Sequence, residues 1–280
     1  MFDPIKASNN IKEEFISYIS TSIHIADKEY ANQFMDALRK ESAVSKGPYL
    51  DISDSFESGL SINKMIEEKQ MSPLFTELEP GVSEGDKEIK LERGLYKHQE
   101  KAIRKINAGK NIVVTTGTGS GKTECFILPI INHLLREKED GTLNDGVRAI
   151  LIYPMNALAN DQMKRLRLIL KDYPDITFGV YNSSTQHEDA AGIAEYGRVF
   201  KDKDGKTLKP LKNEAISRKT MQSRPPHILV TNYAMLEYMM LRPNDDLVFS
   251  GAKLKFLVLD EAHIYRGATG IETSLLLRRL

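Results

Sequence analysis

The chain has 280 residues, of which 41% are apolar, enough to bury a substantial core in one large or two modest domains. Its 39 basic and 39 acidic side chains balance, so a strongly basic nucleic-acid binder is excluded and any contact with DNA or RNA must be local. The single cysteine, Cys125, excludes an internal disulfide and favours a reducing compartment. No secretion signal or bilayer-spanning apolar run is visible, so we expect a cytoplasmic protein without membrane contact.

Residues 1–40 are predicted to be helical, because apolar side chains recur there every three or four residues. Residues 42–90 contain Gly-Pro, Ser-Pro and Pro-Gly pairs, and residues 77–90 are acidic and poor in large side chains. We therefore expect a small, mainly helical accessory region and linker over residues 1–85, and a main domain over residues 86–280.

Short apolar runs alternate with helical segments after residue 91. The runs cover residues 112–115, 148–153, 176–181, 227–231 and 256–259, and the predicted helices between them include residues 122–138 and 156–170. Such runs, separated by helices, are typical of an α/β fold with a parallel sheet covered by helices on both faces. We expect residues 183–224 to form an insertion, with an exposed loop or hairpin tip at residues 201–206.

The first apolar run leads into a glycine-rich turn. The turn consists of Thr116, Gly117, Thr118, Gly119, Ser120, Gly121, Lys122 and Thr123. Closely spaced glycines let backbone N–H groups surround a pyrophosphate, and the following helix adds its positive end. In this pattern Lys122 reaches the β and γ phosphates and the Thr123 hydroxyl binds Mg²⁺. The usual pattern has glycine where this chain has Thr116; the alternative is a glycine-rich hairpin with a chance lysine.

The last apolar run ends in a second candidate site. Asp260, Glu261, Ala262 and His263 follow it directly. An aspartate at the carboxyl end of a buried strand is where a nucleotide-binding sheet places its Mg²⁺ partner, and Glu261 is then positioned to orient the attacking water. Because the strands are parallel, we expect Lys122 and Asp260 to lie at the same edge of the sheet.

These two segments resemble motifs I and II of superfamily 2 helicases of the DEAD/DEAH type, whose first domain is a RecA-like parallel sheet. Residues 95–103 resemble the adenine-recognising Q motif, and residues 153–162 and 229–237 resemble motifs Ia and Ib. The resemblance implies an ATP hydrolase that uses ATP and Mg²⁺. Its implied roles are adenine selection by Gln99, metal binding by Thr123 and Asp260, catalysis by Lys122, Asp260 and Glu261, coupling by His263, and nucleic-acid contact by Pro154, Asn156, Thr231 and Asn232.

The residues around the motifs are similar to those of MrfA-like bacterial DNA helicases and of helicases from Druantia- and DISARM-type defence islands. This likeness implies a DNA helicase or translocase in phage defence or DNA repair. Motif III and the second RecA-like domain, which carries the arginine finger in this family, are not among the 280 residues. We therefore predict a first RecA-like domain that is incomplete at its C-terminus. Alone it would be weakly active or inactive, and a C-terminal domain or a partner subunit would complete it.

Three other functions fit the same residues. A duplex DNA translocase of a restriction-like system uses the same two motifs without separating strands. An RNA helicase is not excluded, because phosphate contacts do not read the sugar. A non-catalytic scaffold that recruits partners through residues 1–90 is the third.

Overall fold

The computed structural model describes residues 3–40, 43–47, 49, 55–78, 89–117, 119–201 and 205–280. Contacts divide the chain into two units, Met1–Ser55 and Phe56–Leu280. Residues 56–78, expected in the accessory region, pack within the larger unit. Residues 79–88, around the end of the predicted accessory region and linker, lie outside the described residues, and the predicted domain division at residue 85 stays a prediction.

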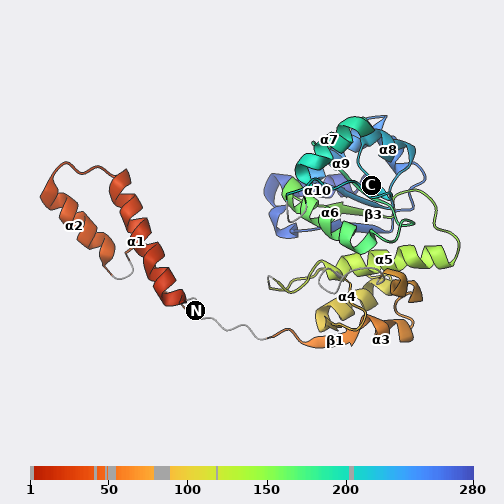
Figure 1. Ribbon diagram of the computed structural model, residues 1–280, viewed down its shortest axis with the longest axis horizontal. Helices are drawn as coiled ribbons and strands as arrows, with labels where there is room; N and C mark the ends of the chain where they lie inside the picture. Colours follow the sequence, from red (N-terminus) through yellow and green to blue (C-terminus); the bar gives the residue numbers. More distant parts are fainter. Residues whose placement is uncertain are drawn as a thin grey trace. The chain divides into compact units, whose positions relative to one another are not determined.

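The smaller unit contains two helices, α1 (Pro4–Ser22) and α2 (Lys28–Arg39), as the apolar spacing predicted (Figure 1). Each begins at an aspartate, Asp3 or Asp27, whose carboxylate accepts hydrogen bonds from backbone N–H groups of the first turn. Among the described residues of this unit, only Ile16 is a buried apolar side chain. The two helices therefore form a small helical module with little core of its own.

A five-stranded parallel sheet forms the centre of the larger unit, in the order β5-β4-β6-β3-β7. The strands are β3 (Ala149–Ile152), β4 (Phe178–Tyr181), β5 (Glu214–Ala215), β6 (Ile228–Thr231) and β7 (Phe256–Leu259). Four of them lie in predicted runs. The predicted strand at residues 112–115 is wrong: residues 111–117 form no strand or helix, and Val113 is 89% exposed. A strand needs a hydrogen-bonded neighbour, and these residues have none in the described sheet.

Helices cover both faces of the sheet because successive strand residues point to opposite sides. In β3, Leu151 packs toward one core with α5 (Glu124–Glu139) and α6 (Asn156–Leu170). Ile150 packs toward a second core with α9 (Tyr233–Leu241) and α10 (Gly267–Leu277). The larger unit is thus a RecA-like α/β domain, as the sequence predicted.

The predicted insertion contributes to this domain. It contains α7 (Asp189–Val199), the edge strand β5, which the sequence did not predict, and α8 (Arg218–Ser223). Lys201 and Thr207 form an antiparallel bridge around the predicted loop tip, of which residues 202–204 lie outside the described part.

A layer on the far side of α5 is built from residues before the glycine-rich turn at residues 116–123, the candidate phosphate loop. Its elements are β1 (Ser58–Ser61), α3 (Ile62–Glu67), the 3-10 helix η1 (Pro73–Leu78), β2 (Gly94–Tyr96) and α4 (Lys97–Asn107). The strands β1 and β2 pair antiparallel, and α4 packs on α5. Figure 1 shows α4, α3 and β1 on one side of α5, with α6 and the sheet on the other.

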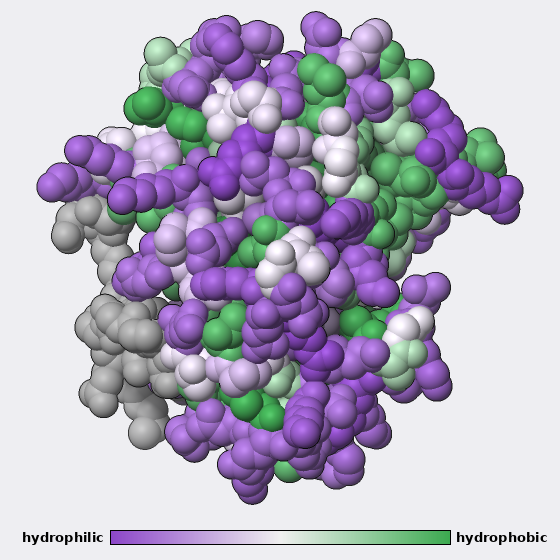
Figure 2. All heavy atoms as spheres, turned by 90° about the vertical axis from the view of Figure 1, so that its right-hand side faces the viewer, coloured by the Kyte–Doolittle hydropathy of each residue, from purple (hydrophilic) through white to green (hydrophobic). Residues whose placement is uncertain are grey.

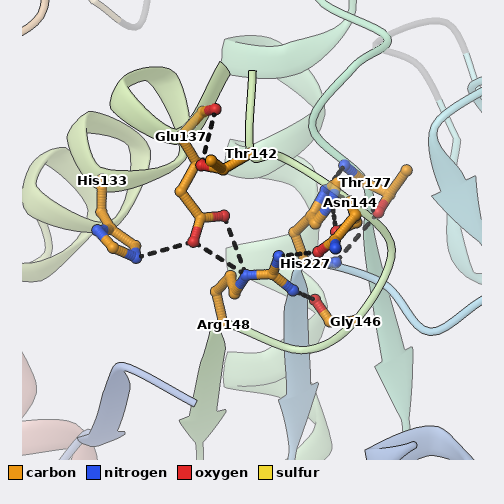
Figure 3. A network of polar contacts seen from close by, with 8 residues as sticks. All are labelled: His133, Glu137, Thr142, Asn144, Gly146, Arg148, Thr177 and His227. Atoms are coloured by element: carbon orange, nitrogen blue, oxygen red, sulfur yellow. Dashed lines mark hydrogen bonds and ion pairs between the residues drawn. The ribbon is translucent and has the colours of Figure 1, made fainter. Parts of the chain in front are cut away.

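A buried polar network fixes the amino ends of β3 and β6 (Figure 3). Arg148, which is fully buried, donates to the Glu137 carboxylate at 3.0 Å and to the carbonyl of Gly146 at 2.7 Å. His227 accepts from the N–H of Thr177 at 3.0 Å through Nδ1, and its Nε2 lies 3.1 Å from the carbonyl of Asn144. Burial lowers the pKa of His227, so the ring is held neutral. The network joins the connection between α5 and β3 to the amino ends of the strands. The motif that begins at Asp260 lies at the opposite, carboxyl ends.

The remaining elements of the larger unit are the 3-10 helices η2 (Asp245–Phe249) and η3 (Ala262–Ile264). Over the described parts of the chain, no helix combines the length and apolarity needed to cross a bilayer.

Candidate functional site

The phosphate loop precedes α5 and passes twice through left-handed backbone. Gly119 has a φ of 73° and Gly121 a φ of 69°, which glycine adopts without the steric cost of a side chain. Ser120 between them is buried, and its hydroxyl lies 2.6 Å from that of Thr116. Such turns orient backbone N–H groups toward one side, as an anion requires. Thr118 lies outside the described residues.

Helix α4 anchors this loop through Gln99, which is 1% exposed. The Oε1 atom of Gln99 accepts from the N–H of Tyr96 at 2.8 Å, and its Nε2 donates to the carbonyl of Gly121 at 2.9 Å. The neighbouring His98 places Nε2 2.9 Å from the carbonyl of Ser120. The structure therefore gives Gln99 a role in holding the loop that sequence reasoning missed; adenine recognition by Gln99 stays a prediction.

Lys122 points into its own loop. Its ammonium donates to the carbonyl of Thr116 at 2.8 Å and to that of Gly117 at 3.2 Å. These are neutral acceptors, and no carboxylate lies within ion-pair distance of this lysine among the described residues. The positive charge is therefore available to a phosphate in the loop. Thr123, the next residue, lies at the N-cap of α5, where the positive end of the helix dipole adds to it.

The carboxylates of the second motif follow β7. The N–H of Asp260 donates to the carbonyl of Ile152 at 3.0 Å, which continues the β3–β7 ladder by one residue. Glu261 then adopts left-handed backbone with a φ of 49°, a strained conformation for a residue with a side chain. Its carboxylate lies 3.2 Å from Nδ1 of His263, and both side chains reach solvent. The turn thus directs Glu261 and His263 outward from the end of the strand.

The two motifs converge electrostatically. Burial raises the pKa of Asp260; the N–H of Glu261 and the ammonium of Lys122 lower it, while the charge of Glu261 raises it further. Lys122 therefore acts on the charge of Asp260, but the strand at residues 112–115 on which the expected shared sheet edge relied is not formed, so that arrangement stays a prediction. Tyr153 and Tyr265 border the same carboxylate: burial and the charge of Asp260 raise the pKa of both phenols, that of Tyr265 to about 12.

The donors at this edge fit Mg²⁺ only if it arrives with a nucleotide. No group of three or more His, Cys, Asp and Glu side chains in the described ranges could hold a metal by itself. Mg²⁺ is usually bound through one or two carboxylates together with substrate phosphates and water. The Thr123 hydroxyl and the Asp260 carboxylate are suitable for that limited share of the coordination.

Three aromatic rings beside the loop were missed by sequence reasoning as a group. The ring of Phe56 lies 5.2 Å from that of Tyr96 and 5.7 Å from that of His98, centroid to centroid, and Tyr96 stacks on His98. A Cβ atom on Gly117 would be 4.0 Å from Phe56. Tyr96 and His98 precede Gln99 within the segment that resembles the Q motif, and this proximity was a signal for them. Phe56 lies outside any motif, so the sequence gave no signal for it.

A half-buried ion pair also supports the loop and was not predicted. One carboxylate oxygen of Glu124 accepts from Arg165 on α6 at 2.8 Å, and the other is buried without a hydrogen-bond partner among the described residues. The second oxygen is 2.8 Å from the position of a Cβ atom on Gly121. The first turn of α5 is therefore tied to α6 directly behind the phosphate loop.

The predicted nucleic-acid residues lie at the carboxyl ends of β3 and β6, but not all are accessible. Asn232 donates to Asn156 at 3.2 Å, and Asn156 donates to the hydroxyl of Ser183 at 3.3 Å. Thr231 is fully buried, and its hydroxyl donates to the carbonyl of Tyr181 at 2.7 Å, so the structure gives it a partner in β4 instead of one in solvent. Ser183, which sequence reasoning missed, replaces Thr231 in this polar group, which thus consists of Asn156, Ser183 and Asn232.

Pro154 is half-buried beside it, one residue before the exposed Met155. The contact of these four residues with nucleic acid stays a prediction.

Comparison with known proteins agrees with this arrangement. The family model "DEAD/DEAH box helicase" matches residues 96–280. The chain is similar to Druantia protein DruE of Escherichia coli (strain UMEA 4076-1), with 30% identity over 97% of this chain and 19% of DruE. It is also similar to the uncharacterized ATP-dependent helicase YprA of Bacillus subtilis (strain 168), with 31% identity over 66% of this chain and 20% of YprA.

The fold is similar to that of the DUF1998 helicase MrfA, solved bound to DNA and AMPPNP. The TM-score is 0.56 at 23% sequence identity, over 89% of this chain and 28% of that one. The chain thus spans about a fifth of the length of the curated relatives named above. From its motifs, its fold and the family match, this chain belongs to the DEAD/DEAH box helicases.

Proposed function

We propose that this chain is the ATP-binding part of a DNA helicase or translocase. The observation that carries the proposal is the left-handed glycine loop directly before α5, with the Lys122 ammonium folded into it, together with Asp260 at the carboxyl end of β7. This combination supplies a cradle for phosphates and a carboxylate for the metal that accompanies them.

Each site residue has a distinct proposed task. Thr116, Gly117, Thr118, Gly119, Ser120 and Gly121 form the loop whose N–H groups surround the phosphates. Lys122 exchanges the carbonyls of Thr116 and Gly117 for the β and γ phosphates. Thr123 and Asp260 share Mg²⁺, which would offset phosphate charge during transfer. Glu261 orients the attacking water, and its strained turn keeps the carboxylate outside the sheet.

The base of the nucleotide is proposed to lie near the N-terminus of α4. Gln99 retains one amide hydrogen and one lone pair beyond its two protein contacts, which suits the N6/N7 edge of adenine. Phe56, which is partly exposed next to Tyr96 and His98, offers a ring face for stacking. His263, within contact distance of Glu261, is proposed to transmit nucleotide state to the bound strand.

A second RecA-like domain, in a longer form of the chain or in a partner subunit, is proposed to complete the site. The relatives are about five times as long as the matched segment. Within the described sheet β7 pairs only with β3, and all four of its residues are half-exposed. On α10 the side chain of Ile271 is 64% exposed and that of Leu275 is also exposed. An apolar sheet edge and helix of this kind are normally covered by further polypeptide. A donated arginine would add about 10³ to 10⁵ in rate, so the chain alone is expected to hydrolyse ATP very slowly.

DNA is the proposed track. Asn156, Ser183 and Asn232 present neutral hydrogen-bonding groups of the kind that contact phosphate oxygens and release them again. The structural neighbour MrfA was solved bound to DNA, and the name of DruE places that relative in the Druantia system. We extend these two statements to a role in phage defence or DNA repair.

The proposal is tested by nucleotide binding and turnover of the chain. We expect weak Mg²⁺-dependent binding of a fluorescent ATP analogue, lost in Lys122→Ala and kept in Lys171→Ala, a matched exposed lysine on α6's C-cap. Glu261→Gln should keep binding and lose the residual hydrolysis. Binding unaffected by Lys122→Ala, or rapid DNA-stimulated hydrolysis by the chain alone, would contradict the proposal.

The alternatives differ in measurable ways. A duplex translocase displaces a triplex strand but does not open a forked duplex. Both assays on the complete enzyme would therefore distinguish a translocase from a helicase. An RNA helicase would show stimulation by RNA oligonucleotides over DNA. A scaffold would bind partners through residues 1–90 with Lys122→Ala as well as the wild type does.

A further inference from the structure

A pocket of about 440 Å³, lined mainly by cationic and amide residues, lies outside the nucleotide site, where the turn after α3 meets the last turns of α4 and α5. It is lined by Lys69, Gln70, Arg104, Asn107, Ala108 and Arg136. None of these residues belongs to the phosphate loop or to the segment after β7. Figure 2 views the larger unit from the side on which α3 and the end of α5 lie in Figure 1, and hydrophilic residues cover most of its lower half.

One backbone carbonyl connects the three elements that form the pocket, which are α4, α5 and the turn after α3. The carbonyl of Gln70 accepts from Asn107 of α4 at 2.7 Å, from Asn132 of α5 at 3.2 Å and from Arg136 of α5 at 3.1 Å. Lys69, directly before it, has left-handed backbone with a φ of 59°. Arg136 also fixes the backbone of this turn, because its guanidinium donates to the carbonyl of Lys69 at 2.9 Å.

The charges of the pocket are not balanced from within. Three lining residues are cationic and none is acidic. Arg104 is compensated by Glu68 and Glu100. Lys69 and Arg136, in contrast, have no carboxylate within ion-pair distance over the ranges that the structure describes, and Arg136 donates only to carbonyls. The pocket therefore retains about two uncompensated positive charges next to the amides of Gln70 and Asn107.

We propose that this pocket binds the phosphate backbone of a nucleic-acid strand, as a second contact separate from the polar group at the carboxyl ends of β3 and β6. Arginine and lysine with neighbouring amides are the groups that hold phosphate without reading the bases. The pocket volume of about 440 Å³ is within the usual range of ligand pockets. The side chain of Lys69 is exposed, which suits a nucleic-acid strand that runs across the surface. The inference rests on the proposed nucleic-acid function.

A purely structural origin predicts a different outcome. Cations gather at helix C-termini because they offset the helix dipole, and Lys69 and Arg104 both lie near such ends. In that case removal of the Lys69 charge would change stability slightly and leave nucleic-acid binding unchanged.

The experiment measures binding of a fluorescein-labelled single-stranded DNA oligonucleotide to the chain by anisotropy, from 50 mM to 300 mM salt. Lys69→Asn removes the charge with a residue that tolerates left-handed backbone, and Lys69→Glu reverses it. Lys64→Gln is the matched control, because Lys64 is an exposed lysine of α3, the helix directly before Lys69, and does not line the pocket. Thermal unfolding of each variant verifies that the fold is retained.

We expect Lys69→Asn to reduce the slope of log affinity against log salt by about 0.7, the value for one lost phosphate contact on a single strand. At 50 mM salt this corresponds to binding that is about eightfold weaker. Lys69→Glu should weaken binding further, and Lys64→Gln should match the wild type.

Equal slopes for wild type, Lys69→Asn and Lys69→Glu would overturn the inference while leaving the proposed function in place. The same loss in Lys64→Gln would also overturn it, because the effect would then be general charge. Absence of any oligonucleotide binding by the wild type would contradict both proposals. Tripolyphosphate serves as a second probe: Lys69-dependent binding of tripolyphosphate without binding of the oligonucleotide would reject nucleic acid as the ligand.

Discussion

Substitution of Gly121 by alanine tests how the phosphate loop is held. A Cβ atom there would overlap with Nε2 of Gln99, and the φ of 69° is unfavourable for alanine. Gln99 cannot move aside freely, because its Oε1 is bound to the N–H of Tyr96 and its Nε2 to the carbonyl of Gly121. Gly119 is the matched control: its φ is 73°, and a Cβ atom there meets no atom within 4 Å.

The geometry sets the size of the effect. Left-handed backbone costs alanine about 1–2 kcal/mol at either position. At Gly121 the displaced Gln99 amide and the carbonyl lose their hydrogen bond while buried, which adds about 1–3 kcal/mol. The reduced entropy of the unfolded chain offsets part of the cost equally in both variants. We expect the unfolding free energy to fall by about 1–2 kcal/mol in Gly119→Ala and by about 2–5 kcal/mol in Gly121→Ala.

The measurement is urea unfolding of the wild type and both variants, followed by circular dichroism. Gln99→Ala, alone and combined with Gly121→Ala, closes a double-mutant cycle, in which the second change should cost less once Gln99 has been removed. Equal destabilisation by the two glycine variants, or strict additivity in the cycle, would refute the role given to Gln99.

Three further predictions concern the interior. Arg148→Met leaves the Glu137 carboxylate without its buried partner and should lower the unfolding free energy by about 3–5 kcal/mol in urea titrations. Lys171→Met, the control, should change it by less than about 0.5 kcal/mol. Similar losses of unfolding free energy in the two variants would contradict the network. Burial lowers the pKa of His227 below its ordinary 6.5, so the unfolded chain binds the proton more readily and the unfolding free energy should fall as the pH drops below about 6.5. His227→Gln should flatten this dependence between pH 5 and 7. An unchanged pH profile would argue against a buried neutral ring. Burial raises the pKa of the Cys125 thiol to about 12, so iodoacetamide at pH 8 should modify it far more slowly in the folded chain than in urea, and equal rates would be inconsistent with its position on α5.

Sequence patterns predicted the parallel sheet well because its strands are buried on both faces. The run that became β7 was predicted with its observed limits, as was helix α6. The predicted strand at residues 112–115 had the same apolar character, yet a strand forms only beside a paired neighbour, and composition does not reveal whether that neighbour is present. The two-residue strand β5 was missed because so short a segment has no periodicity.

Candidate site residues could be named from the sequence where they are consecutive, as in the loop that ends at Thr123 and the motif that begins at Asp260, and their roles stay predictions. They could not be named where three elements meet. Phe56 reaches the loop from a position outside any motif, and the pocket around Lys69 combines residues of α4 and α5 with the turn after α3. Thr231 shows a third limit: its place at the end of β6 was predicted, but the direction of its hydroxyl depends on the neighbouring strand.

The central claim is that the phosphate loop and the turn after β7 meet at one metal-bound triphosphate. The most direct test adds Mn²⁺ and ATP to the isotopically labelled chain and records paramagnetic broadening of backbone amide signals. The account predicts strong broadening of Gly121, Lys122 and Thr123 together with Asp260 and Glu261, while the signal of Arg148 at the opposite sheet edge stays sharp. Broadening of the loop alone, with sharp signals from Asp260 and Glu261, would contradict it.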